Sequence, residues 1–285
     1  MNYPLGVLFG IIVMISWGLD KICWKKVSSK LDHHTMLLFN YFFMVLFLFI
    51  FSAITNNIKW ISLNDLLLAA FMGFLGFIAI LMFFISFRFT QISLITALTT
   101  AYVPIAAILA VFIFKESITL LLLIGTALVF MGIFLLSLKD GKLKIKNWKI
   151  TLLLAAAISV IWGFTYPFLR ILVNSMGAVT ASLYFEGFIM LFCLIYFLIR
   201  NKNHKFIVKK ENTRWLILSG LLGAVGAVFY NFSLDHGLIL IASPMASASM
   251  IITVLASWLF LKERLTKKQW VYIIVILSGL ILISI

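Results

Sequence analysis

Long apolar segments alternate with short polar breaks along the whole chain. The apolar segments run about 20 residues and lack the alternation over about 10 residues that marks a strand of a membrane barrel. A segment of this length crosses a bilayer as a helix, because a helix satisfies its own backbone N–H and C=O groups in hydrocarbon. The ten predicted spans are 5–24, 36–54, 66–87, 92–114, 118–138, 150–173, 178–199, 215–234, 238–261 and 270–285.

The composition fits a lipid environment. Hydrophobic residues make up 64% of the 285 positions and charged residues only 11%, so a water-soluble fold could not hide its apolar side chains. We therefore expect an all-α, multi-pass protein of the cell membrane. The net charge of +14 lies in short segments between apolar runs and forms no stripe, so no nucleic-acid partner is expected. Cys23 and Cys193 lie inside apolar runs without ligand spacing, and we expect no metal and no cofactor.

Matching pieces recur in the two halves of the chain. Their separation is 145 residues in the early part of each half and 147 later, as a duplication with one two-residue insertion would leave. Each half, 1–146 and 147–285, then holds five helices. Because five is odd, the second repeat is inverted relative to the first, about an axis in the membrane plane. The matched pieces are Trp17-Gly18 with Trp162-Gly163, Gly73/Gly76 with Gly220/Gly223, and Phe114-Lys115-Glu116 with Leu261-Lys262-Glu263.

The basic residues predict an orientation. Loops after odd-numbered spans hold 19 of the 23 Lys and Arg residues, whereas the opposite face has only Lys59, Lys115 and Arg170, and Lys21 lies within the first span. Basic loops are retained in the cytoplasm. The count therefore predicts that both termini lie outside the cytoplasm.

In these motifs the chain resembles the drug/metabolite transporter superfamily, in particular its ten-helix EamA-type exporters. A Trp-Gly pair in the first helix of each half is followed eight residues after the Trp by a cation, Lys25 or Arg170. A Glu closes the fourth helix of each half, at Glu116 and Glu263, and Pro104 precedes the first by twelve residues. The chain departs from the family in the Lys before each Glu. The resemblance implies export or exchange of a small organic solute, and it implies cytoplasmic termini, against the charge count.

Glu186 is the residue in the spans that most needs an explanation. It lies eight positions into its segment, about 12 Å deep at helical rise. A carboxylate there is costly unless it is paired, wetted or protonated. It could exchange a proton and couple transport to a proton gradient, or receive a cationic amine. Alternatively it forms a structural ion pair with Arg170, because both flank the short turn 174–177 and lie at similar depth.

Two cations occupy equivalent places in the halves. Inversion puts Lys25 and Arg170 near opposite membrane faces, where they could steer an anionic group or latch alternate gates. The alternative is that each long side chain extends to the headgroups. Asp20 and Lys21 are adjacent and point different ways round a helix, so one of them is expected to face a wet cavity.

Aromatic and polar groups in mid-segment complete the candidate site. Trp17 and Trp162 lie far from the interfacial belts, and they either stack on a substrate or pack at the symmetry axis. Other mid-segment groups could orient a ligand in an apolar pocket: Tyr102, Tyr166, Tyr184, Tyr230 and Asn231.

A secondary transporter working by alternating access accounts best for an inverted repeat with polar groups inside the membrane. Its expected partners are a small solute and membrane lipid, with a monomer or homodimer as the working form. An intramembrane enzyme would need a catalytic cluster, yet all four histidines lie in or beside loops. A channel or scaffold without a transport cycle is the other alternative.

Overall fold

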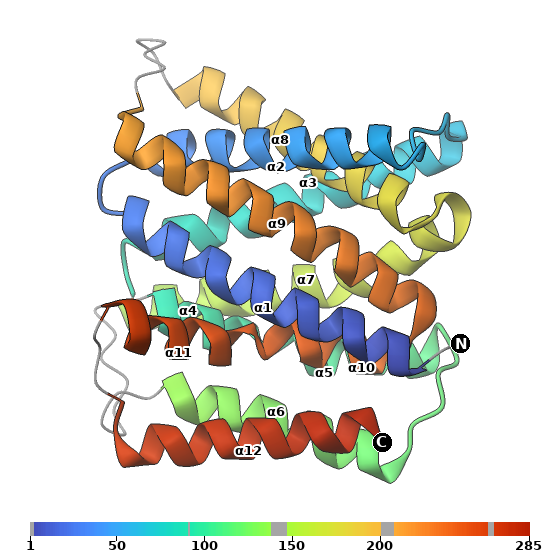
Figure 1. Cartoon of the computed structure of the whole chain (residues 1–285), viewed down its shortest axis with the longest axis vertical. Coiled ribbons are helices and arrows are strands. Elements are labelled where there is room, and N and C mark those ends of the chain that lie inside the picture. Colours follow the sequence, from blue (N-terminus) through green and yellow to red (C-terminus); the bar gives the residue numbers. More distant parts are fainter. Residues whose placement is uncertain (1–2, 91, 138–146, 201–207, 262–264) are drawn as a thin grey trace.

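A computed structural model gives the arrangement of the chain in space (Figure 1). It describes residues 3–90, 92–137, 147–200, 208–261 and 265–285, and no strand occurs among them. The helices are α1 (Tyr3–Val27), α2 (His33–Ile54), α3 (Leu63–Ser86), α4 (Ile92–Thr99), α5 (Tyr102–Phe112), α6 (Leu120–Ser137), α7 (Trp148–Met176), α8 (Ala178–Arg200), α9 (Lys210–His236), α10 (Ile239–Ser247), α11 (Ser249–Leu261) and α12 (Lys267–Ser284).

The helices correspond to the ten predicted spans. In the described residues, nine stretches are long and apolar enough to cross a membrane, and the tenth span is the shorter apolar helix Leu120–Leu136. In Figure 1, α1 runs away from the N-terminus while the equivalent α7 runs in the opposite sense. The prediction of an all-α membrane fold with two inverted five-helix repeats is confirmed. The predicted boundary between 146 and 147 adjoins residues outside the described ranges, and it stays a prediction.

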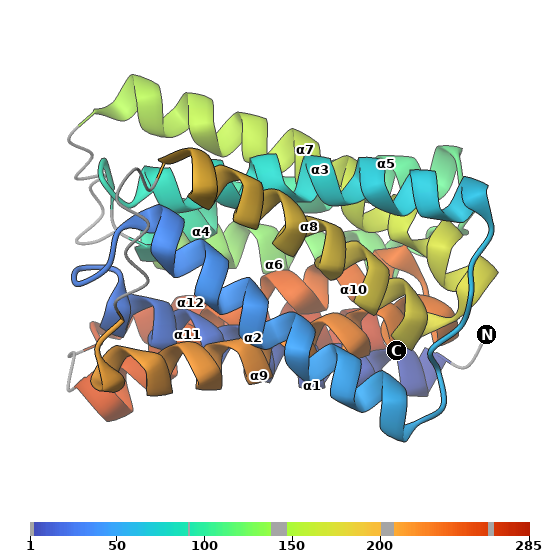
Figure 2. The same cartoon turned by 90° about the horizontal axis from the view of Figure 1, so that it is seen from above.

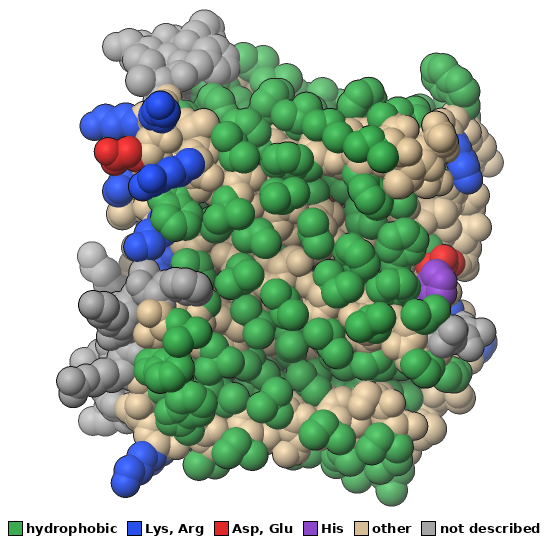
Figure 3. All heavy atoms as spheres, in the orientation of Figure 1, with side chains coloured by type: hydrophobic (Ala, Val, Ile, Leu, Met, Phe, Trp, Pro, Cys, Tyr) green, Lys and Arg blue, Asp and Glu red, His purple; other side chains and the backbone are tan. Residues whose placement is uncertain are grey.

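The surface has the polarity of a membrane protein. Hydrophobic side chains cover most of the face in Figure 3, and charged side chains gather at its two ends. Large apolar residues in mid-helix are well exposed, for example Phe71 at 59% and Leu153 at 71%. Since water would make such exposure costly, this belt is the surface that faces lipid.

The fourth span of each half is broken at the same place. α4 gives way to α5 at Thr100 and Ala101, and α10 gives way to α11 at Ala248, which is 147 residues after Ala101. Pro104 lies in the first turn of α5, where its ring disfavours a continuous helix through Thr100. The equivalent residue in the second half is Ile251, so a proline cannot be the general cause. The breaks bring irregular backbone to the middle of the membrane, beside the cavity described below.

The two repeats are interleaved. α1 packs along α9 and the equivalent α7 packs along α3, while α2 pairs with α8 and α6 with α12 (Figures 1 and 2). Each of these contacts joins one half to the other. Neither half therefore buries its apolar faces alone, and the molecule is one membrane body.

The glycine of each Trp-Gly pair permits this close packing. A Cβ on Gly18 would lie 2.4 Å from Ile252 Cβ, and a Cβ on Gly163 would lie 2.6 Å from Ile105 Cγ2. Ile252 follows Ile105 by 147 residues, so the same contact occurs twice with the halves exchanged. The first helix of each half thus packs against the broken fourth span of the other half, with no room for a side chain.

Candidate functional site

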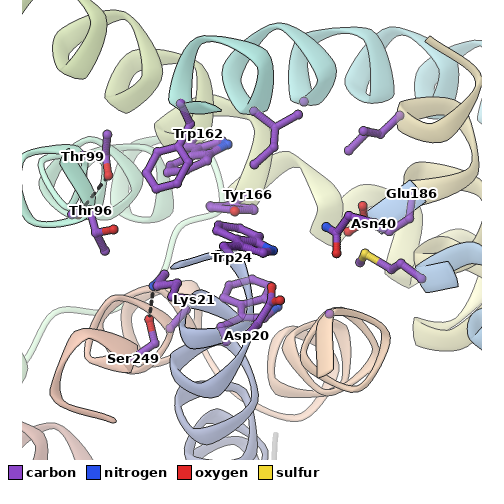
Figure 4. Close-up of a pocket in the computed structure, with 18 of the residues that line it drawn as sticks. Asp20, Lys21, Trp24, Asn40, Thr96, Thr99, Trp162, Tyr166, Glu186 and Ser249 are labelled. Atoms are coloured by element: carbon purple, nitrogen blue, oxygen red, sulfur yellow. Dashed lines mark hydrogen bonds between the residues drawn. The ribbon is translucent and has the colours of Figure 1, made fainter. Parts of the chain in front are cut away.

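A cavity of about 120 Å³ lies between the repeats (Figure 4). Of its 23 lining residues, 18 form nine pairs that are equivalent under the repeat. The cavity is therefore centred on the pseudo-two-fold axis, where transporters with inverted repeats hold their substrates. The pairs are Trp17/Trp162, Lys21/Tyr166, Asn40/Phe185, Tyr41/Glu186, Met44/Ile189, Gly76/Gly223, Thr99/Ala246, Thr100/Ser247 and Tyr102/Ser249.

Asp20 and Asn40 meet at a serine of α9. The Ser219 hydroxyl donates to the Asp20 carboxylate, and its oxygen lies 2.5 Å from Asn40 Oδ1. The same oxygen accepts a hydrogen bond of 2.9 Å from the indole N–H of Trp24. One hydroxyl carries one proton, so only one of the two oxygens receives it at a time. The network joins α1, α2 and α9, and it gives the Asp20 carboxylate a protein partner.

Glu186 has no such partner. It lines the cavity from α8 and is only 7% exposed (Figure 4). Within the described ranges, the structure records neither a hydrogen bond nor an ion pair to its carboxyl group. A charged side chain at this depth costs roughly 2.5–3.5 kcal/mol on insertion scales. The cavity is the place where water or a cationic group can reach it.

Lys21 and Thr96 form a second polar corner. The ammonium of Lys21 donates to Ser249 Oγ over 2.7 Å. Thr96 lines the same part of the cavity, and its buried hydroxyl has no hydrogen-bond partner (Figure 4). A hydroxyl and an ammonium with free donors together favour an acceptor in the cavity.

Aromatic rings form one wall. Trp17 stacks on Tyr166 with ring centroids 6.0 Å apart, and Trp162 stacks on the same ring at 5.9 Å. Tyr230 packs behind Trp17, at 5.6 Å. Gly226 makes room for this arrangement, because a Cβ there would lie 2.2 Å from Trp17 Nε1. The two tryptophans thus pack at the symmetry axis and also border the cavity, so both sequence interpretations describe part of their surroundings.

The expected ion pair between Arg170 and Glu186 is wrong. Arg170 pairs instead with Glu116, in the turn between α5 and α6, and both residues are buried. The Glu116 carboxylate also accepts the backbone N–H groups of Ile239 at 2.8 Å and Leu240 at 3.1 Å, at the start of α10. Depth along a helix matched Arg170 to Glu186, but the two side chains point toward different neighbours.

This pair also excludes extension of Arg170 to the headgroups, since its residue is only 8% exposed. Burial raises the pKa of the Glu116 carboxyl, while the two N–H groups and the guanidinium act in the opposite direction. Lys25 lies near the far end of α1, on the opposite face. Glu263, the equivalent of Glu116, lies outside the described residues.

Comparison with known proteins decides the family. Residues 4–138 and 149–285 each match the model of the EamA-like transporter family. The chain belongs to this family. The EamA-like transporter is 36% identical over 96 residues to uncharacterized protein MJ1333.1 of Methanocaldococcus jannaschii, covering 34% of this chain and 69% of that protein. A solved crystal structure, described only as that of a protein, superposes with a TM-score of 0.82 over 98% of both chains; at 11% identity it shows the fold alone.

The EamA-like transporter brings six of the predicted substrate-binding residues to its cavity. The other three lie elsewhere. The Tyr184 hydroxyl donates to the Lys59 carbonyl at the end of the molecule, and Tyr230 packs behind the aromatic wall. Asn231 donates to Ser182 Oγ away from the cavity. The six lining residues are Trp17, Asp20, Tyr102, Trp162, Tyr166 and Glu186.

Three polar lining residues were not among the predicted binding residues: Lys21, Asn40 and Thr96. The sequence held a signal for two of them. Lys21 was the one cation left inside a predicted span, and Asn40 is an amide inside another. Nothing in the sequence distinguishes Thr96 from the neighbouring threonines, because its role depends on the break between α4 and α5.

The face that carries the N-terminus is tied together more firmly than its pseudo-symmetric counterpart. The Ser233 hydroxyl donates to the Gly6 carbonyl over 2.8 Å, joining the end of α9 to the start of α1. The equivalent pair on the opposite face is Ser86 and Thr151, but Ser86 donates to Phe83 of its own helix. The EamA-like transporter is therefore asymmetric although its repeats are related. Its N-terminal face is the closed one by this comparison.

Proposed function

We propose that this membrane transporter of the drug/metabolite type is a secondary transporter of the cell membrane that moves a small organic solute by alternating access, in export or exchange. The observation that carries the proposal is the single cavity lined by nine equivalent residue pairs. A site on the axis can be presented to either side when the repeats exchange conformations.

The broken symmetry of the closing contacts supports the same proposal. In this conformation Ser233 bonds to Gly6, whereas Ser86 bonds within α3. Exchanging the two arrangements would open the N-terminal face and close the other. The two conformations would then use the same kinds of contact and differ little in free energy, as a transport cycle requires.

A ligand screen followed by counterflow tests the proposal. Detergent-purified protein is first screened by thermal shift against amino acids, nucleosides, sugars, vitamins and cationic drugs, because a bound ligand raises the apparent Tm by mass action. Each stabilising solute is then loaded unlabelled into proteoliposomes, with radiolabelled solute outside. We expect saturable, transient accumulation of label that requires the internal load.

Flux that does not saturate and shows no counterflow would indicate a channel and contradict the proposal. Stabilising ligands that never cross the bilayer would indicate a scaffold or receptor. Empty liposomes and liposomes with the Trp17→Ala variant serve as controls for leak.

A further inference from the structure

The cavity carries opposite charges at opposite sides. Figure 4 shows Lys21 with Ser249 and Thr96 on one side of the open space, and Glu186 with Asn40 across it. Lys21 uses one recorded donor, to Ser249, out of the three that an ammonium has. Glu186 is nine-tenths buried and unpartnered among the described residues. Each side is incomplete, and the two need ligand groups of opposite sign.

The two charged positions are also where the repeats differ. The equivalent of Glu186 is Tyr41, and the equivalent of Lys21 is Tyr166, so each charge faces a tyrosine in the other half. All four residues line the cavity. Folding of the inverted repeat requires no charge at either position, since the other half folds with tyrosine there. The charges therefore give a symmetric pocket a direction.

Asp20 is the third charged group and does not compete for the same role. Its carboxylate receives the Ser219 hydroxyl, in the network with Asn40 and Trp24. A group already bonded to its own protein gains less from a ligand than one with no partner. Glu186 is thus the acid that a ligand would complete.

We infer that the substrate is a small zwitterion with an apolar body, an inference that rests on the transport function proposed above. Its ammonium binds the Glu186 carboxylate, and its carboxylate binds the ammonium of Lys21 with the Thr96 hydroxyl. Both contacts are charge-assisted hydrogen bonds in a water-poor site. The apolar body lies against the aromatic wall formed by Trp17, Trp162 and Tyr166.

Three probes with one apolar body test the inference on the wild-type chain. They are phenylalanine, phenethylamine, which lacks the carboxylate, and 3-phenylpropionate, which lacks the ammonium. Leucine, 3-methylbutylamine and 4-methylpentanoate repeat the test with a smaller body. By thermal shift we expect the zwitterion of at least one series to bind at least tenfold more tightly than either of its analogues.

Two variants assign the ends. Glu186→Gln should remove the response to the zwitterion and to the amine, whereas Lys21→Met should make the zwitterion no better than the amine. The matched controls are Glu211→Gln and Lys210→Met, in the exposed first turn of α9, and they should bind like the wild type. The ranking of probes on the wild type needs no variant, so it stands even if a variant fails to fold.

An amine or an acid that binds as tightly as its zwitterion overturns the inference, and so does the failure of both zwitterions to bind. Unchanged ranking in correctly folded Glu186→Gln or Lys21→Met also overturns it. Counterflow separates this result from the proposed function. Counterflow of some other class of solute would sink the zwitterion and leave the transporter, whereas zwitterion binding without counterflow would do the reverse.

Discussion

The guanidinium of Arg170 and the carboxylate of Glu116 form a buried ion pair that joins α7 to the turn before α6. The carboxylate also holds the first N–H groups of α10, at Ile239 and Leu240. An anion at a helix N-terminus is favourable because the backbone donors there have no partner within the helix. One side chain thus fixes three separate elements on the N-terminal face of the molecule.

Breaking this pair from one side should be far worse than removing both charges. Arg170→Met leaves a buried carboxylate without its cation, and we expect a loss of about 3–5 kcal/mol of stability. Adding Glu116→Gln should restore much of that loss, because no unpaired charge then remains. Thermal unfolding of the wild type, both single variants and the double variant in detergent gives the coupling. Simple addition of the two single losses would show that the pair is not coupled.

The glycines of the two Trp-Gly pairs should be intolerant of any side chain. Gly18→Ala and Gly163→Ala each place a Cβ within 2.6 Å of an isoleucine atom on the other half. Overpacking of this kind costs about 1–3 kcal/mol. Gly187→Ala is the matched control, because a Cβ there meets no atom within 4 Å. We expect a lower Tm for the first two variants and an unchanged or higher Tm for the control; equal behaviour of all three would disprove close packing at these positions.

Ser219 should be worth more than its single hydroxyl implies. Ser219→Ala removes the group that Trp24, Asp20 and Asn40 all contact, and it leaves buried polar atoms without that partner. The cost of such orphaned groups is about 1–3 kcal/mol. Ser175→Ala removes only an exposed hydrogen bond to Asp65 and should cost about 0.5 kcal/mol or less. Unfolding midpoints measured side by side decide this, and similar losses would argue against the network.

Much of the architecture could be predicted because it depends on local pattern. Apolar length gave the ten spans, and the recurrence of Trp17-Gly18 at Trp162-Gly163 gave the duplication. An odd number of spans per repeat then fixed the inversion. None of these inferences needs knowledge of which side chains meet.

The parts that failed depend on direction round a helix and on tertiary contacts. Arg170 and Glu186 lie at similar depth, but depth does not say which way a side chain points, and Arg170 turns to Glu116 instead. The break at Ala248 has no proline in the place that Pro104 takes in the first half. Tyr184 was placed in the site by its depth, whereas its hydroxyl reaches the Lys59 carbonyl outside the cavity.

The orientation is open to a direct labelling test. Lys59 lies in the turn after α2, on the face of the termini, and Lys210 begins α9 on the opposite face. From the charge count, Lys59→Cys should react with a membrane-impermeant maleimide in intact cells, and Lys210→Cys only after lysis. The native Cys23 and Cys193 are buried and give little background. The reverse pattern would place both termini in the cytoplasm, as the family resemblance implies.

Alternating access is the central claim, and cross-linking of the closed face tests it most directly. Asp65 Oδ2 and Ser175 Oγ lie 2.6 Å apart, joining α3 to α7 on the N-terminal face. In a variant lacking Cys23 and Cys193, the substitutions Asp65→Cys and Ser175→Cys can be bridged by a short reagent with two methanethiosulfonate groups. Each single-cysteine variant, treated alike, controls for the reagent.

The measurement is counterflow of radiolabelled phenylalanine, or of whichever solute passes the thermal-shift screen, before and after bridging. The account predicts that counterflow falls to the level of empty liposomes once the N-terminal face is locked, and that a reductant restores it. Counterflow at the unbridged rate in fully cross-linked protein would contradict the account, because solute would then cross without the face opening.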